Sequence, residues 1–238
     1  TLGFSSAASD VYKRQDIWGI RHGNYKKEMA TPFRTANLKN VKKYANLGLF
    51  SITFSKSLNH DLEMLNSYRD FREEAEKNNF NYFLEVFNPQ TKTGLNQLQL
   101  GEYVNDCILK TLAGQLKSER PLFLKIAYNG PKAMEELAGY DPKNLIVGIL
   151  GGGKGTTRDC FELISKSCKY GAKVALFGRK INLAEDQQLI VKTMRDVVNG
   201  MTSTEGVKFY HDQLKKKKIK PDRSLDKDLM ITEKVLKL

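Results

Sequence analysis

From residue 49 onward, the apolar positions switch repeatedly between the two-residue period of strands and the three-to-four-residue period of helices. The run LFSITFS at 49–55 is rich in apolar and β-branched residues and predicts a strand. Ser57 follows as a predicted helix N-cap. Apolar residues then recur on one predicted helix face at Leu58, Leu62, Leu65, Tyr68 and Phe71. Residues 49–71 therefore predict one strand-helix unit.

The same rhythm returns four more times. Further strands are predicted at 81–87, 122–128, 145–150 and 173–178. The helices that follow them are predicted over Leu100 to Leu112, Pro131 to Leu137, Thr157 to about Tyr170, and Glu185 to Val198. Strands that alternate with amphipathic helices indicate a parallel sheet. Five units at about 30 residues each match the spacing of a (β/α)8 TIM barrel, in which eight units occupy roughly 250 residues.

Polar residues within the predicted strands favour a closed barrel over an open sheet. Ser51 and Thr53, then Glu85, then Lys125 lie at alternating strand positions. In an open parallel sheet both faces are covered by helices, so strands there are almost continuously apolar. A barrel lumen that opens at one end tolerates these side chains better. We therefore predict an α/β chain of the (β/α)8 TIM-barrel class with a helical extension at its carboxyl end.

The composition is typical of a single globular domain. The chain has 238 residues, of which 40% are apolar and 28% charged. It contains no apolar run of the roughly 18 to 20 residues that a membrane helix needs, and no signal-peptide pattern. Its cysteines, Cys107, Cys160 and Cys168, have neither metal-ligand spacing nor an even number. We expect a soluble, cytoplasmic protein without membrane attachment, bound metal or cofactor.

The net charge of +12 raises the question of nucleic-acid binding. Much of the basic excess lies in Lys26, Lys27, Lys39, Lys42, Lys43, the run Lys215 to Lys218, and Lys220. No aromatic residues are interleaved there as stacking platforms. We therefore predict a solvated basic surface and no nucleic-acid partner. Such a field also concentrates small anionic substrates.

Both ends of the chain fall outside the predicted barrel units. Residues 1–15, TLGFSSAASDVYKRQ, show no period and resemble a translated library adaptor, so we predict a non-native segment there. A partial barrel domain is predicted over 16–200, and a helical tail over 201–238 on the pattern of Val207, Tyr210 and Leu214. The sequence IWGI at 17–20 is a candidate strand. Only about 33 residues separate residue 15 from the strand at 49, room for roughly one unit, so we expect a barrel without about its first two units.

The glycine-rich segment GILGGGKGTT at 148–157 allows two interpretations. It nearly matches a nucleotide-binding P-loop through Gly148, Gly153 and Lys154, but Gly155 stands where the magnesium-binding hydroxyl belongs. In TIM barrels, phosphate is often held by the loops after strands seven and eight, near a helix amino terminus. A phosphate site there is predicted at Gly151, Gly152, Gly153, Lys154, Gly178 and Arg179. The alternative is that these glycines only form tight turns and that Arg179 pairs with a surface carboxylate.

Lys125 is the candidate for covalent chemistry. In LFLKIAY the alternation points Leu122, Leu124 and Ile126 toward the helices, and so places Lys125 in the barrel interior. Burial disfavours an ammonium and lowers the pKa of lysine, which makes the free amine available to attack a carbonyl carbon. The alternative is a structural ion pair between Lys125 and Glu85.

The segment from LFLKIAYNG through GILGGGKGTTRDCFELISKSCKYGAKVALFGRKIN resembles the carboxyl-terminal half of the archaeal-type class I fructose-bisphosphate aldolases. In that family a lysine on strand six forms a Schiff base, and Lys125 matches it. The family's Gly-Gly-Pro-Lys-Thr phosphate loop is similar to Gly151 through Lys154, with glycine in place of proline. Its Gly-Arg-Asn turn resembles Gly178, Arg179 and Lys180.

The resemblance implies a metal-independent carbon-carbon lyase that acts on a phosphorylated sugar, with no cofactor. A homo-oligomer is compatible with it. One departure concerns the tyrosine that the family places near the end of strand five for proton transfer, because this chain has Phe87 there. Glu85 is then the predicted acid or base. The alternative function is a barrel that binds a phosphorylated ligand without turnover.

Overall fold

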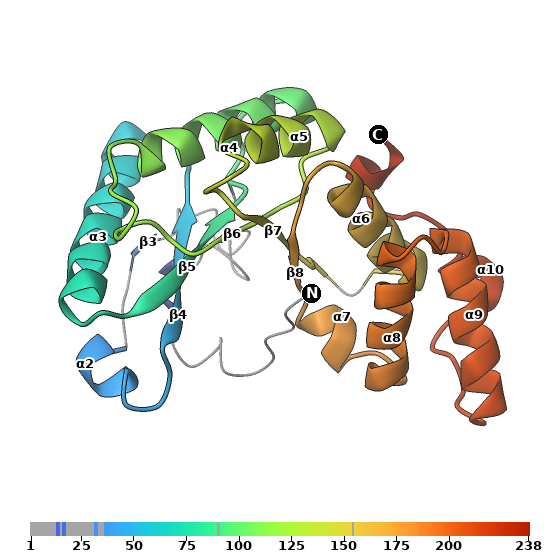
Figure 1. The fold of residues 1–238 in the computed structure, drawn as a ribbon. Coiled ribbons are helices and arrows are strands. Elements are labelled where there is room, and N and C mark those ends of the chain that lie inside the picture. The colour runs from blue at the N-terminus through green and yellow to red at the C-terminus, as the bar shows by residue number, and fades with distance from the viewer. Residues whose placement is uncertain (1–12, 15, 18–30, 33–35, 90, 154) are drawn as a thin grey trace. The chain divides into compact units, whose positions relative to one another are not determined.

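The computed structural model describes residues 13–14, 16–17, 31–32, 36–89, 91–153 and 155–238 (Figure 1). Its contacts divide the chain into two compact units. The amino-terminal unit consists of the described residues up to Ala127, together with Asp141–Val147. The carboxy-terminal unit consists of the described residues of Tyr128–Tyr140 and Gly148–Leu238. Each unit is described by itself below.

Three parallel strands organise the amino-terminal unit. They are β4 (Leu47–Thr53), β5 (Asn81–Phe87) and β6 (Leu124–Ile126), and β5 lies between the other two. The short strand β1 (Lys13–Arg14) pairs in parallel with β4, a pairing that the sequence pattern did not predict. A small antiparallel pair is formed by β2 (Asp16–Ile17) and β3 (Thr31–Pro32). Of the candidate strand at 17–20, only Ile17 belongs to the described residues.

The helices α2 (Leu38–Val41), α3 (Leu58–Lys77) and α4 (Gln97–Leu112) complete this unit. Helix α3 covers one face of the strands through aromatic contacts, because the ring of Phe50 lies 5.3 Å from that of Tyr68 and 4.8 Å from that of Phe71. Since side chains alternate along a strand, the residues on either side of Phe50 point to the opposite face.

The predicted buried face of α3 was wrong in its first two turns. Leu58 and Leu62 are 73% and 48% exposed. The observed buried stripe runs through Met64, Tyr68, Phe71 and Ala75. Leu62 precedes Met64 by two residues, about 200° around the helix, so it points away from that stripe.

The carboxy-terminal unit contains two parallel strands and the helices that follow them. In chain order these are α5 (Pro131–Tyr140), β7 (Val147–Leu150), α6 (Thr157–Lys169), β8 (Val174–Leu176), α7 (Arg179–Asn182) and α8 (Gln187–Val198). Residue Val147 at the start of β7 belongs to the other unit by its contacts. The rest of β7 pairs with β8, with Gly148 opposite Val174. The strands predicted at 122–128 and 173–178 are confirmed in place but are shorter, at three residues each.

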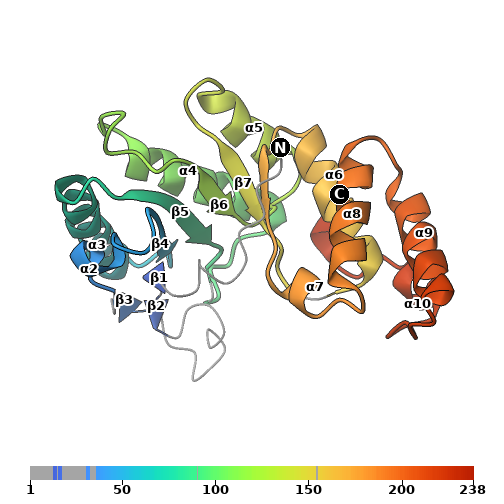
Figure 2. The same ribbon diagram turned by 60° about the horizontal axis from the view of Figure 1, so that its bottom comes forward.

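The tail packs against the helices of this same unit (Figure 2). It contains α9 (Ser203–Lys216), α10 (Leu225–Asp228) and the 3-10 helix η1 (Lys234–Lys237). The predicted apolar residues Val207, Tyr210 and Leu214 are fully buried. At Gly206 an added β-carbon would lie 3.0 Å from Phe161 and 3.1 Å from Val197. Helix α9 therefore approaches both α6 and α8 closely.

Candidate active site

A row of three polar residues crosses the strands of the amino-terminal unit. Ser51 on β4 lies in register with Glu85 on β5, which lies in register with Lys125 on β6. The Nζ atom of Lys125 is 2.6 Å from Oε1 of Glu85. The hydroxyl of Ser51 donates a hydrogen bond of 3.1 Å to Oε2 of the same carboxylate. Both carboxylate oxygens of Glu85 are thus partnered.

The row lies on the face opposite α3 and is largely withdrawn from water. The side chain of Glu85 is 4% exposed and that of Lys125 is 15% exposed. Two residues earlier in the sequence, the rings of Phe83 on β5 and of Phe123, which directly precedes β6, stack at 4.6 Å with 14° between their planes. These rings form an apolar floor next to the ion pair. The orientation of Lys125 therefore follows the alternation predicted from LFLKIAY.

The geometry allows direct proton exchange between lysine and carboxylate. A distance of 2.6 Å is a charge-assisted hydrogen bond. The ion pair that the sequence offered as the structural alternative is thus present, but it does not exclude chemistry. A carboxylate at that distance is within reach to take the proton of the ammonium and leave a free amine.

Beyond this row, the same face carries a hydroxyl without a hydrogen-bond partner. Thr53 is 3% exposed, and its Oγ1 makes no hydrogen bond. Its register neighbour on β5 is Phe87, which has no polar side-chain atom. Phe87 stands where the resemblance described above implies a tyrosine, and its side chain cannot transfer a proton.

The glycine-rich turn after β7 contains glycines of different kinds. Gly151 is required by packing, because an added β-carbon would lie 2.3 Å from the ring of Phe177. Gly152 and Gly155 have positive φ angles of 61° and 56°. Gly153 is exposed, has open space around it and shows no such angle. The predicted ligand Lys154 lies outside the described residues.

The turn after β8 contains two adjacent basic residues that differ in their exposure to solvent. Gly178 and Arg179 are exposed. Lys180 is 4% exposed, and its Nζ lies 3.6 Å from Oε1 of the half-buried Glu233. Arg179 is therefore accessible to an anion, whereas Lys180 forms an ion pair with the tail. Gly148 lies inside β7, so it does not occupy the loop position that a P-loop requires.

The amino terminus of α6 was expected to face the anion, but carboxylates of the chain occupy it. Oδ2 of Asp159 accepts a hydrogen bond of 3.0 Å from the Thr156 N–H. Oδ1 of Asp228 accepts one of 2.8 Å from the Thr157 N–H. Burial raises the pKa of Asp159, but hydrogen bonds from Thr156, Thr232 and Glu233 outweigh this effect and hold the pKa below its ordinary value.

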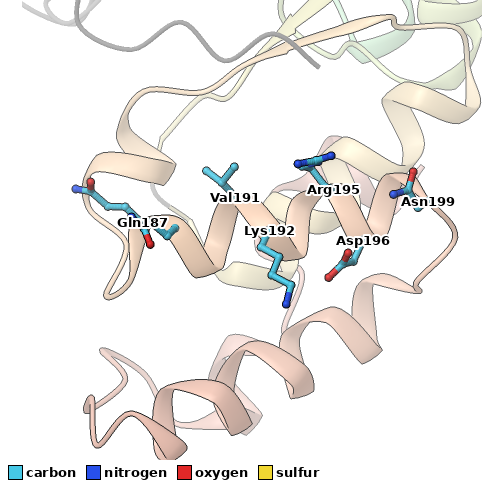
Figure 3. A pocket seen from close by; sticks show the side chains of 7 residues that line it. Gln187, Val191, Lys192, Arg195, Asp196 and Asn199 are labelled. Carbon is cyan, nitrogen blue, oxygen red and sulfur yellow. The ribbon is translucent and has the colours of Figure 1, made fainter. Parts of the chain in front are cut away.

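An open groove of about 530 Å³ runs along α8 (Figure 3). It is lined by Gln187, Val191, Lys192, Arg195 and neighbouring residues of that helix, and by none of the predicted site residues.

Within the part of the chain that the structure describes, no cluster of three or more potential metal ligands is present. Among those same residues, no helix is both long and apolar enough to cross a membrane.

Sequence reasoning missed several residues around these turns. Asp159 had a signal, since Thr156-x-x-Asp159 before an apolar run is the pattern of a capping box, which the structure contains. Asp228, Thr232 and Glu233 had none, because their partners lie about 50 to 75 positions earlier in the sequence. Ser51 was recognised only as a polar strand residue, and its contact with Glu85 depends on register.

No protein-family model matches the chain. A search of curated proteins finds no match either. Solved structures do match. A Schiff-base-forming fructose-1,6-bisphosphate aldolase aligns at 17% identity over 71% of this chain and 65% of its own, with a TM-score of 0.58. An archaeal fructose-1,6-bisphosphate aldolase aligns at 16% identity over 83% and 78%, with a TM-score of 0.61.

A third match is an archaeal fructose-1,6-bisphosphate aldolase whose catalytic lysine is covalently bound to the carbinolamine intermediate of its substrate. It aligns at 17% identity over 72% of this chain and 66% of its own, with a TM-score of 0.57. The chain thus spans slightly less than two thirds of the length of two of these three structures. At this level of identity the likeness concerns the fold. This chain has the α/β fold of the aldolase-type TIM barrel over the part that is matched.

Proposed function

We propose that this protein is a class I, metal-independent aldolase-like lyase that acts on a phosphorylated sugar, with Lys125 as the nucleophile and Glu85 as acid and base. The observation that carries the proposal is the 2.6 Å contact between the half-buried Lys125 and the buried Glu85. They lie on a fold that includes a Schiff-base-forming aldolase. A lysine hydrogen-bonded to a carboxylate can lose its proton without a water molecule as intermediary.

The proposed chemistry balances with these two groups. Glu85 takes a proton from the Lys125 ammonium, and the free amine attacks the carbonyl carbon of a ketose. The attack leaves a negative charge on the former carbonyl oxygen, which takes one proton from Glu85 to form the carbinolamine hydroxyl. This hydroxyl then takes a second proton, which comes from the nitrogen, and leaves as water. The resulting iminium accepts the electron pair of the adjacent carbon-carbon bond when the regenerated Glu85 carboxylate removes the hydroxyl proton of the departing aldehyde. Glu85 returns this proton to the enamine carbon, and hydrolysis of the iminium releases the ketone product and free Lys125.

For the phosphate, we propose the backbone of Gly151 to Gly153, with Lys154, Gly178 and Arg179. Gly153 and Arg179 are exposed, which suits contact with an anion. Glycine lets an anion approach the backbone N–H groups closely, and a guanidinium binds phosphate through two parallel hydrogen bonds. The metal-independent mechanism needs no further group at this position.

Borohydride trapping tests the nucleophile. The full chain is incubated with dihydroxyacetone phosphate and sodium borohydride, and the adduct is located by peptide mass spectrometry. We expect one stable adduct on the peptide that contains Lys125. A matched control is Lys143→Met, which removes an exposed lysine and should leave the yield unchanged. Labelling spread over surface lysines, or none at all, would refute the assignment.

A second candidate is a barrel that binds a phosphorylated ligand without turnover. The observation that favours it is Phe87, because neither Phe87 nor the unpartnered Thr53 hydroxyl opposite it replaces a tyrosine as a proton donor to substrate. The two candidates differ in multiple turnover. An adduct at Lys125 without release of an aldehyde product from fructose 1,6-bisphosphate would favour the second.

Gly153→Ala tests the phosphate turn without disturbing the fold. Since the position has open space and no positive φ angle, we expect the melting temperature to change by less than about 2 °C. The added methyl group should still hinder an anion at the backbone and weaken the binding of inorganic phosphate, measured by calorimetry, about tenfold. Unchanged affinity would show that Gly153 only serves the turn.

A further inference from the structure

The carboxyl-terminal segment 228–233 lies across the start of α6 and contacts it through three alternate residues. The Thr157 N–H donates to Oδ1 of Asp228 at 2.8 Å. The Thr156 hydroxyl donates to the Met230 carbonyl at 2.7 Å. The Thr232 N–H donates to Oδ1 of Asp159 at 2.7 Å. Segment 228–233 is therefore fixed to the helix that follows Gly151 to Gly153, the first of the two proposed phosphate turns; the second is formed by Gly178 and Arg179.

The same segment also holds the second phosphate turn. Lys180 directly follows Arg179, its side chain is 2% exposed, and its Nζ lies 3.6 Å from Oε1 of Glu233. An added β-carbon at Gly155 would lie 3.3 Å from this Nζ and 3.0 Å from Oδ2 of Asp159. The Lys180 ammonium is thus adjacent to the first turn while its backbone belongs to the second. Glu233 neutralises the charge that makes this link.

Asp228 anchors the segment on its other side. Its Oδ2 lies 2.9 Å from Nε2 of His211 on α9, and its side chain is 4% exposed. Both carboxylate oxygens are therefore committed, one to α6 and one to α9. Since α9 is itself closely packed on α6 and α8 at Gly206, Asp228 connects the start of α6, which follows the first turn, to a closely packed helix.

We propose that segment 228–233 is a positioning clamp that sets the geometry of the two phosphate turns, with Asp228, Thr232 and Glu233 as its positioning residues. This inference rests on the phosphate role proposed above for Gly151 to Gly153 and Arg179. Because Asp159 and Asp228 take the N–H groups of Thr156 and Thr157, the anion is held by the turns and by Arg179. The placement of the two turns relative to each other then depends on segment 228–233.

The direction of the effect separates a clamp from a blocking element. If the carboxylates competed with phosphate for the same donors, their removal would tighten phosphate binding. If they position the turns, their removal weakens it. We therefore expect Asp228→Ala to weaken the binding of inorganic phosphate to the full chain about tenfold, a typical cost when a supporting contact behind a binding site is lost.

The experiment combines calorimetry with amide hydrogen exchange in three variants. Asp228→Ala removes both contacts, and Asp228→Asn keeps an oxygen for the Thr157 N–H. The matched control is Asp226→Ala, an exposed carboxylate two residues earlier in α10. Exchange at 151–153 and 178–182 should accelerate in Asp228→Ala, less in Asp228→Asn, and not in Asp226→Ala. Exchange in α3 should stay unchanged in all three. Unchanged exchange and affinity in Asp228→Ala, or tighter phosphate binding, would overturn the proposal.

A third measurement keeps this proposal separate from the proposed function. Trapping yields are compared for dihydroxyacetone phosphate and for dihydroxyacetone, which has no phosphate. In Asp228→Ala the half-saturating concentration should rise for the phosphorylated ketose alone, with the same yield at saturation. If the wild-type chain traps neither ketose, the function of Lys125 fails while the exchange results still decide on the clamp.

Discussion

Replacing Lys125 by methionine is expected to abolish the borohydride-stable adduct and also to destabilise the chain. Without its ammonium, the Glu85 carboxylate is left almost fully buried with Ser51 as its remaining partner. Removing one member of a buried ion pair costs about 3 to 5 kcal/mol. Thermal or urea unfolding of the variant measures this loss, and peptide mapping after trapping measures the loss of the adduct.

The companion variant Lys125→Met/Glu85→Leu separates the two effects. It replaces both charges by apolar groups, which is often neutral or stabilising for a buried pair. We expect most of the free energy of unfolding to return, while adduct formation stays absent. An adduct in the double variant would exclude Lys125 as the nucleophile. The low exposed fractions of both side chains indicate that the pair is withdrawn from water. Equal stability of Lys125→Met and the wild-type chain would contradict this.

Asp159→Ala is expected to have the second largest effect. Its carboxylate accepts hydrogen bonds from the N–H groups of Thr156, Thr232 and Glu233 and from the Thr232 hydroxyl. Each bond to a charged acceptor contributes on the order of 1.5 kcal/mol, and the N–H group of the buried Thr156 would lose its acceptor, so we expect a loss of about 3 kcal/mol. Unfolding measurements and proteolytic sensitivity of the tail test this. Glu205→Ala in the exposed capping box of α9 is the control and should cost much less.

The contribution of Asp159 also has a predictable pH dependence. Its folded-state pKa lies below the ordinary value of 3.8, so its stabilisation is fully present above that pH and is lost as the pH falls through the lower folded-state value. The difference in stability between the wild-type chain and Asp159→Ala should therefore shrink below about pH 4. The pKa of the neighbouring Glu233 changes in the opposite direction, because burial raises it. A difference that stays constant down to pH 2 would contradict the assignment.

Alternation along the strands was enough to predict which side of the sheet carries the candidate chemistry. Lys125 and Glu85 point away from α3, as the two-residue period requires. The sequence did not determine that they lie directly opposite one another, since register depends on how neighbouring strands pair. The same limitation explains why the hydrogen bond of Ser51 was not foreseen. The role of these residues in catalysis stays a prediction.

Helical periodicity was less reliable than strand alternation. In α3, Leu58 and Leu62 fit a helical spacing with Tyr68, yet the packed stripe follows Met64 instead, because a helix with apolar residues on several sides has more than one candidate face. The helical tail was predicted, but its function was not. Asp228 and Met230 contact the start of α6 across more than 70 positions of sequence, and no local pattern encodes such a pairing.

The ion pair between the buried Lys180 and the half-buried Glu233 has a consequence for how the two positions evolve. In a protein of this fold with a neutral residue in place of Lys180, an acidic residue at the position of Glu233 would lack the Lys180 cation, while the negative charge of Asp159 would remain nearby. The two positions should therefore change together during evolution, as a coupled pair linking the second turn to the tail. Such co-variation offers a way to recognise the clamp in sequences too divergent to align by identity.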